Sequence, residues 1–121
     1  MSEIWKEIQG DFSGTQKYEG NIRIRGNVLS GSRLEISSGN IEITGWVENS
    51  QIKTDHGWIK VAGEIRGIQS QIISGGSITA ASVHLSRLKA REDIILKEKA
   101  SAAQMICRKY FIMNKGQGHL Q

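Results

Sequence analysis

The chain of 121 residues has no proline, a single cysteine and no long apolar run. Because Cys107 has no second cysteine to pair with, no disulfide can form within the chain. No stretch reaches the roughly 18 apolar residues of a membrane-spanning helix, and the first residues lack the basic and apolar regions of a secretion signal. We therefore expect a cytoplasmic protein with one domain that needs neither disulfides nor a metal for its core.

Glycine is abundant where proline is missing, with 14 glycines in the chain. Proline cannot donate a hydrogen bond to a strand ladder, whereas glycine fits corners at which φ is positive. This composition is typical of a chain built almost entirely from short strands and tight corners.

Short runs of alternating apolar residues recur along the chain. Their first residues are spaced by 19, 18, 19, 16 and 17 positions, and they are Ile22, Ile41, Ile59, Ile78, Ile94 and Phe111. Two positions after each comes a second apolar residue: Ile24, Ile43, Val61, Ala80, Leu96 and Met113. This period of two predicts strands with one buried face.

Each period also contains a return strand and one further apolar position. The inward pairs of the return strands are Leu34 and Ile36, Ile52 and Thr54, Ile72 and Ser74, Leu88 and Ala90, and Met105 and Cys107. The single positions between the two strands are Val28, Val47, Ile65, Val83 and Ala100. The sequence thus predicts an all-β fold, a single-stranded right-handed parallel β-helix (solenoid) of about six rungs and roughly 29 Å in length.

We expect residues 1–121 to form a single domain. Residues 20–113 form the regular rungs, residues 1–19 an N-terminal cap with a first partial rung, and residues 114–121 a C-terminal tail.

The N-terminal cap is predicted to be a short helix that covers the first rung. Ser2 can cap it, and Ile4, Trp5 and Ile8 would share one face. The alternative is an irregular first strand.

Stacked rungs place equivalent outward residues above one another. The residues between the first inward pairs are Arg23, Glu42 and Lys60, whose charges alternate in sign. This column supports the alignment, although exposed pairs contribute only a few tenths of a kcal/mol each.

The repeat resembles a known family. The stretch GNIEITGWVENSQIKTDHGWIKVAGEIRG has a recurring Gly-x-Ile-x-Val/Ile-x-Gly pattern and the return strand VENSQIKT, and a doubled glycine, Gly75 and Gly76, precedes SITAASV. Over roughly residues 20–113 it is similar to the β-helical part of the bacterial flagellar assembly protein A family, and more distantly to the bactofilins, small polymer-forming cytoskeletal proteins. The resemblance implies a non-enzymatic assembly role and no catalytic residues.

Positive charge concentrates in the last third of the chain. Residues 1–82 carry 8 basic and 9 acidic side chains, whereas residues 83–121 carry 8 basic and 3 acidic ones. Five of the basic residues are predicted to project outward from two neighbouring rungs on one face: Arg87, Lys89, Arg91, Lys97 and Lys99. This face is a candidate surface for an acidic protein, a membrane or nucleic acid, with a merely solvated face as the alternative.

Four apolar side chains are candidates for an assembly or partner surface. Ile95 and Ile112 are predicted in outward positions of the last two rungs, and Trp46 and Trp58 beside corners. For the tryptophans, partial burial is an equal alternative.

Catalytic and metal sites are not expected. His56, His84 and His119 fall in different positions of the repeat, and the adjacent Asp55 and His56 point in different directions with no aligned nucleophile. Cys107 is expected to be a small core residue. We expect no cofactor and no small-molecule substrate.

The leading hypothesis is therefore a structural scaffold that forms a homo-oligomer or docks another protein. The alternative is a binding module for an anionic surface through the basic residues.

Overall fold

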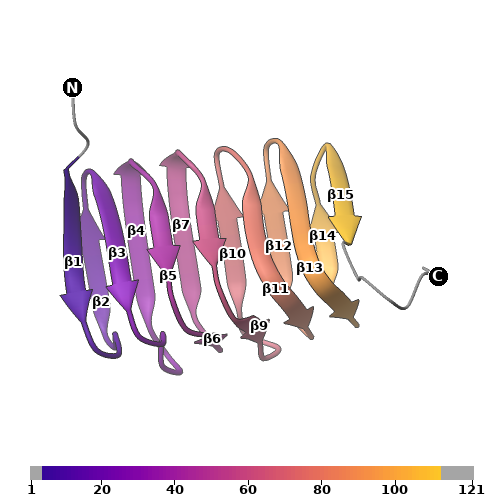
Figure 1. The fold of residues 1–121 in the computed structure, drawn as a ribbon, viewed down its shortest axis with the longest axis horizontal. Helices are drawn as coiled ribbons and strands as arrows, with labels where there is room; N and C mark the ends of the chain where they lie inside the picture. The colour runs from indigo at the N-terminus through magenta and orange to yellow at the C-terminus, as the bar shows by residue number, and fades with distance from the viewer. Residues whose placement is uncertain (1–3, 113–121) are drawn as a thin grey trace.

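The computed structural model describes residues 4–112 and shows a stack of parallel strands, with no helix among these residues. Two sheets face each other along the stack (Figure 1). The front sheet contains, in spatial order, β1 (Trp5–Gln9), β3 (Asn21–Arg25), β5 (Ile41–Ile43), β8 (Ile59–Val61), β11 (Ile78–His84), β13 (Asp93–Ser101) and β15 (Lys109–Ile112). The back sheet contains β2 (Thr15–Tyr18), β4 (Arg33–Ser38), β7 (Gln51–His56), β10 (Gln71–Ser74), β12 (Arg87–Ala90) and β14 (Gln104–Ile106).

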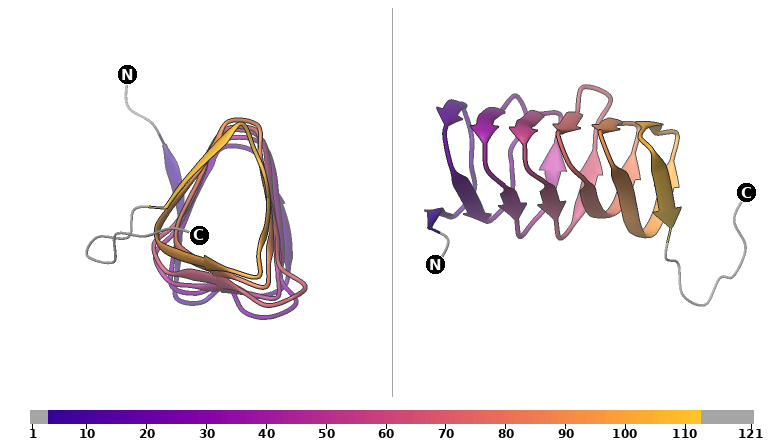
Figure 2. Two further views of the ribbon diagram at one scale, coloured as in Figure 1. Left: turned by 90° about the vertical axis from the view of Figure 1, so that its right-hand side faces the viewer. Right: turned by 90° about the horizontal axis from the view of Figure 1, so that it is seen from above.

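A short third side closes each turn and gives a triangular cross-section (Figure 2). It is formed by β6 (Val47–Glu48), β9 (Glu64–Arg66) and the C-terminal parts of β11 and β13. In Figure 1 the chain descends in the front sheet, ascends in the back sheet and advances from left to right. The winding is therefore right-handed, as predicted from the handedness of parallel crossovers.

The registers confirm the predicted alignment of the repeats. Ile22, Ile41, Ile59, Ile78 and Ile94 are successive partners in the front sheet, and each is at most 1% exposed. The back sheet aligns Leu34, Ile52, Ile72, Leu88 and Met105 in the same way. Burial of each isoleucine or leucine contributes roughly 1.5–3 kcal/mol, so these columns form the core along the axis.

The predicted N-terminal helix is wrong. Residues Trp5–Gln9 form β1, which pairs in parallel with β3 over five residues. Regular strand pairing therefore begins before residue 20, where the regular rungs were predicted to start after a first partial rung. The alternation was hidden because Lys6, a charged residue, occupies the inward position opposite Ile22.

The predicted alignment of the last rung is shifted by one residue. Tyr110 pairs with Ile94, Phe111 with Ile95 and Ile112 with Leu96, so Phe111 points outward and Ile112 inward. Every position from 110 to 112 is apolar or aromatic, so the pattern fits either phase. The corner before β15 decides between the two phases, because it is one residue shorter than the preceding corner. The Arg108 N–H holds it by donating to the Glu92 carbonyl at 2.7 Å. Met113 lies outside the described residues.

Candidate functional site

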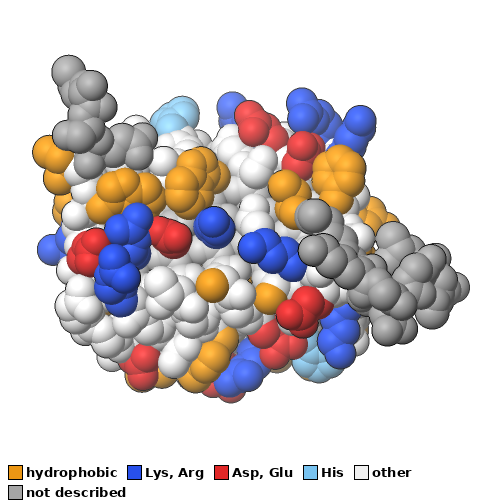
Figure 3. Space-filling model, in the orientation of Figure 1, with side chains coloured by type: hydrophobic (Ala, Val, Ile, Leu, Met, Phe, Trp, Pro, Cys, Tyr) orange, Lys and Arg blue, Asp and Glu red, His pale blue; other side chains and the backbone are white. Residues whose placement is uncertain are grey.

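The alternating charges of the front sheet form a column of ion pairs at its N-terminal half (Figure 3). The guanidinium of Arg23 lies between two carboxylates, with Nε 2.6 Å from Glu42 Oε1 and Nη1 3.0 Å from Glu7 Oε2. Glu7 also accepts from Arg25 Nε at 2.8 Å. The predicted stacking of Arg23, Glu42 and Lys60 is confirmed, and this surface is largely self-neutralised.

Both tryptophans considered as partner contacts already contact other side chains. The ring centroids of Trp58 and Trp5 lie 5.8 Å apart at an angle of 42°, and the Arg66 guanidinium lies 4.5 Å from the centre of the Trp46 ring. Trp58 is still 37% exposed. The use of either tryptophan by a partner stays a prediction.

The predicted apolar surface of Ile95 and Ile112 does not exist in that form. Ile95 is outward and half-buried on β13, but Ile112 packs against the core because of the shifted register. The outward neighbour of Ile95 is Phe111, which is 47% exposed.

The five basic residues do not share one face. Arg87 and Lys89 point outward from β12 in the back sheet, and Arg91 follows the end of that strand. Lys97 and Lys99 lie on β13, in the other sheet, where an irregularity replaces simple register with β11. The prediction was wrong because it treated neighbouring rungs as one surface, although a corner of the triangle separates β12 from β13.

The C-terminal end of the stack presents a nearly complete apolar layer. Among the described residues, β14 and β15 each have a neighbouring strand on one side only. The inward side chains of this last turn pack against the core and stay partly exposed: Ala100, Ala103, Met105, Cys107 and Ile112. Tyr110, in the inward position above Ile94, is 56% exposed.

The N-terminal end has a different character. Phe12 is buried and Ile8 and Tyr18 pack partly against the core, but Lys6 and Gln16 occupy inward positions of the same turn. The ammonium group of Lys6 lies 5.6 Å from the centre of the Tyr18 ring. A charge in an inward position opposes strand addition, because another chain would have to bury it.

The buried corner between the third side and the back sheet is built by serines. Ser32, Ser50, Ser70 and Ser86 stack here and are each at most 2% exposed. Their hydroxyls donate to corner carbonyls, as Ser70 does to Arg66 at 2.8 Å, and Ser50 and Ser70 also accept backbone N–H groups of the preceding rung. No buried side-chain polar atom of the described residues lacks a partner.

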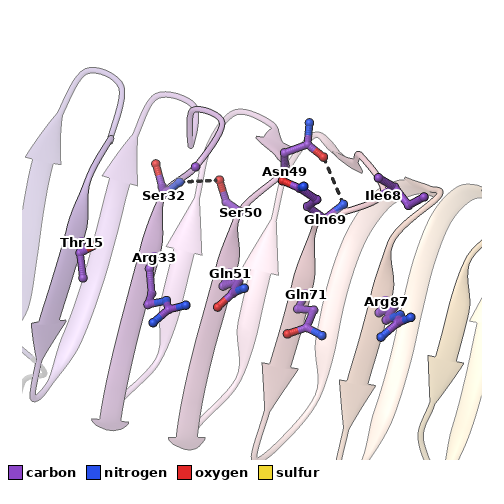
Figure 4. A pocket seen from close by; sticks show the side chains of 11 residues that line it. Thr15, Ser32, Arg33, Asn49, Ser50, Gln51, Ile68, Gln69, Gln71 and Arg87 are labelled. Carbon is purple, nitrogen blue, oxygen red and sulfur yellow. Dashed lines mark hydrogen bonds between the residues drawn. The ribbon is translucent and has the colours of Figure 1, made fainter.

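A polar groove of about 630 Å³ runs across the rungs beside these serines (Figure 4). Its floor is the first outward column of the back sheet, which contains Thr15, Arg33, Gln51, Gln71 and Arg87. The repeated pattern Ser-Arg/Gln-Leu/Ile, which occurs at residues 32–34, 50–52, 70–72 and 86–88, is the signal for this column. Our sequence interpretation missed it because it followed the outward residues of the back sheet along single strands and not from rung to rung.

The side chains that could act in catalysis or bind a metal are dispersed over the described residues. His56 and His84 are exposed on different strands, and no cluster of three potential metal ligands occurs within residues 4–112. Burial raises the pKa of the Cys107 thiol, so the nucleophilic thiolate is disfavoured. His119 lies outside the described residues. The described part of the chain has no helix long and apolar enough to cross a membrane.

Comparison with known proteins agrees with this geometry. No curated protein and no solved structure gives a significant match to the chain. A family model, described as the Flagellar Assembly Protein A beta solenoid domain, matches residues 13–121. The chain forms a right-handed parallel solenoid, and it belongs to the flagellar assembly protein A β-solenoid domain family.

Proposed function

We propose that this protein is a non-enzymatic scaffold of flagellar assembly that self-associates through the C-terminal end of its solenoid. The family supports the assembly role in general. The observation that carries the self-association is the apolar layer of Met105, Cys107, Tyr110 and Ile112 on strands that, within residues 4–112, are paired on one side only. The cytoplasmic location expected from the sequence stays a prediction.

A second copy is the occupant that fits this end best. The end combines an apolar layer with strand edges that no other described strand pairs with, and another layer of the same triangular outline would cover both. Contact between two C-terminal ends buries apolar groups on both sides. Contact with an N-terminal end would bury Lys6 and Gln16 instead. A closed two-fold dimer, the commonest form of homo-oligomer, follows from this difference.

The test is the molar mass in solution of four forms of the protein by sedimentation velocity over a range of concentrations. The wild type is expected to shift from monomer to dimer. Met105→Lys, which places a charge on the apolar end, is expected to stay monomeric. Ile8→Lys at the opposite end and Ile106→Lys on the outer face of β14 are expected to dimerise as the wild type does.

Each other result contradicts a definite part of the proposal. A wild type that is monomeric at every concentration removes self-association. Longer polymers that Ile8→Lys also abolishes show head-to-tail stacking and contradict the closed dimer. Loss of the dimer in Ile106→Lys but not in Met105→Lys moves the contact to the lateral face.

A further inference from the structure

The polar groove is lined by hydrogen-bond donors and by no carboxylate. Its lining contains two arginines, four amide side chains, two serines and a threonine, but no aspartate or glutamate. In the front sheet, by contrast, every arginine faces a carboxylate. The groove is therefore positive without internal compensation.

The two groove arginines are unpaired among the described residues, whereas four of the other five described arginines are paired. Arg23, Arg25, Arg66 and Arg108 each form an ion pair. Arg33 and Arg87 form neither an ion pair nor a side-chain hydrogen bond with another residue of the range 4–112, and both side chains are exposed. Their guanidinium groups keep all their donors for a ligand, and a carboxylate can accept two of these donors at once.

The spacing of the arginines suits an extended chain that runs along the solenoid axis. Arg33 and Arg87 are three rungs apart, with Gln51 and Gln71 between them. At about 4.8 Å per rung, this separation is about 14 Å. In an extended peptide, side chains four residues apart on the same side are separated by about 13 Å. The intervening glutamine amides can donate to and accept from the peptide backbone.

One wall of the groove is a corner that is longer than its equivalents. Six positions separate Ile65 from Gln71, whereas four separate the equivalent Val83 from Arg87. The extra length presents Ile68, which is 76% exposed, at the rim (Figure 4). The Gln69 N–H donates to Asn49 Oδ1 at 3.2 Å and ties the corner to the preceding rung. The wall is thus anchored and offers an apolar contact to a bound chain.

We propose that this groove binds an extended acidic peptide segment of a protein partner, with carboxylates four residues apart on Arg33 and Arg87. A nucleic acid fits less well, because the lining has no aromatic side chain on which a base could stack and only two cations for phosphates. The proposal does not depend on the contact between C-terminal ends.

The spacing is tested on the wild-type protein by fluorescence anisotropy at low ionic strength. The probes are two fluorescein-labelled nonapeptides of serine and threonine, each with two glutamates, which are four residues apart in one and two residues apart in the other. The first is expected to bind at least about fivefold more tightly. Equal binding of the two peptides, or no binding of either, overturns the proposal.

The location is tested with variants of matched charge. Arg33→Gln/Arg87→Gln is expected to weaken binding of the first peptide by at least about tenfold. Lys97→Gln/Lys99→Gln removes the same charge from the other sheet and is expected to change it less than about twofold. Equal weakening by both variants shows non-specific attraction and contradicts the proposal. Displacement of the peptide by equimolar octathymidylate or octagalacturonate assigns the groove to another class of anionic polymer.

Discussion

At the scale of single residues, the N-terminal strand is held to the stack by charge as well as by backbone pairing. Glu7 on β1 accepts from Arg25 and Arg23 on β3. The hydrogen bond from Arg25 and, to a smaller extent, the one from Arg23 hold the pKa of the Glu7 carboxyl below its ordinary value of 4.5. The ion pairs of Glu7 therefore help to hold β1 on the stack, although this strand contributes few residues to the core.

The pH dependence of this contribution has a definite sign. Because the pKa of Glu7 is lowered in the folded state, its stabilisation is fully present above about pH 4.5 and is lost as the pH falls through the lowered pKa. Glu7→Gln is expected to lower Tm at pH 7 and to have little effect at pH values below the lowered pKa. Thermal unfolding followed by circular dichroism against pH measures this.

Glu98→Gln is the control, since Glu98 is exposed on β13 and makes no ion pair with another described residue. Its Tm difference from the wild type should be small at every pH. A Glu7→Gln difference that persists unchanged into acid would show that the effect is not electrostatic.

At the scale of elements, the corners limit how closely rungs can stack. Gly39 has φ of 148°, and a Cβ atom there would clash with the backbone carbonyl of Gly20 in the preceding rung. Gly10 also has a positive φ, of 92°, but a Cβ atom there would meet nothing within 4 Å. Gly10 is thus required only for its backbone conformation, whereas Gly39 is also required because the neighbouring rung leaves no room for a side chain.

Alanine substitutions at these positions are expected to differ in cost. Gly10→Ala should destabilise by about 1 kcal/mol, because only the left-handed conformation is strained. Gly39→Ala should cost about 1–3 kcal/mol more, because rungs must also move apart. Urea unfolding of both variants measures the difference, and equal costs would contradict the claim that the corner is closed to a side chain.

At the scale of the whole molecule, the solenoid is a rod with two unlike ends. Lys6 and Gln16 make the N-terminal end more polar than the C-terminal end, where Met105, Cys107 and Ile112 are apolar. Lateral faces consist of columns that stack residues far apart in sequence. The ends therefore suit self-association, and the long faces suit extended ligands.

Cys107 reports on the apolar end, because it is the only thiol and lies in the last turn. Burial raises its pKa, so alkylation by iodoacetamide should be slow compared with the urea-unfolded chain. If two C-terminal ends meet, the alkylation rate should fall further as the wild-type concentration rises. The Met105→Lys variant should show a rate that is independent of concentration. A concentration-independent rate in the wild type would contradict the end contact.

The sequence by itself determined the class of fold, its repeat and its core. Alternation with a period of two and a recurrence of 16–19 residues place Ile22, Ile41 and Ile59 inside whatever the neighbours do, because a strand buries every second side chain. The charge column of Arg23, Glu42 and Lys60 followed from the same register. These predictions succeeded because they depend on local pattern and constant rung spacing.

Only the tertiary structure decided the register at the two ends of the stack and the neighbours of the outward side chains beyond the Arg23 column. The inward Lys6 interrupted the apolar alternation of the first strand, and the consecutive apolar residues at 110–112 were compatible with two registers. A corner of the triangle separates Arg87 and Lys89 from Lys97. The groove arises because Arg33 and Arg87, 54 positions apart in sequence, lie in one column. Corner lengths set these neighbours, and they depend on backbone hydrogen bonds between rungs that no apolar pattern encodes.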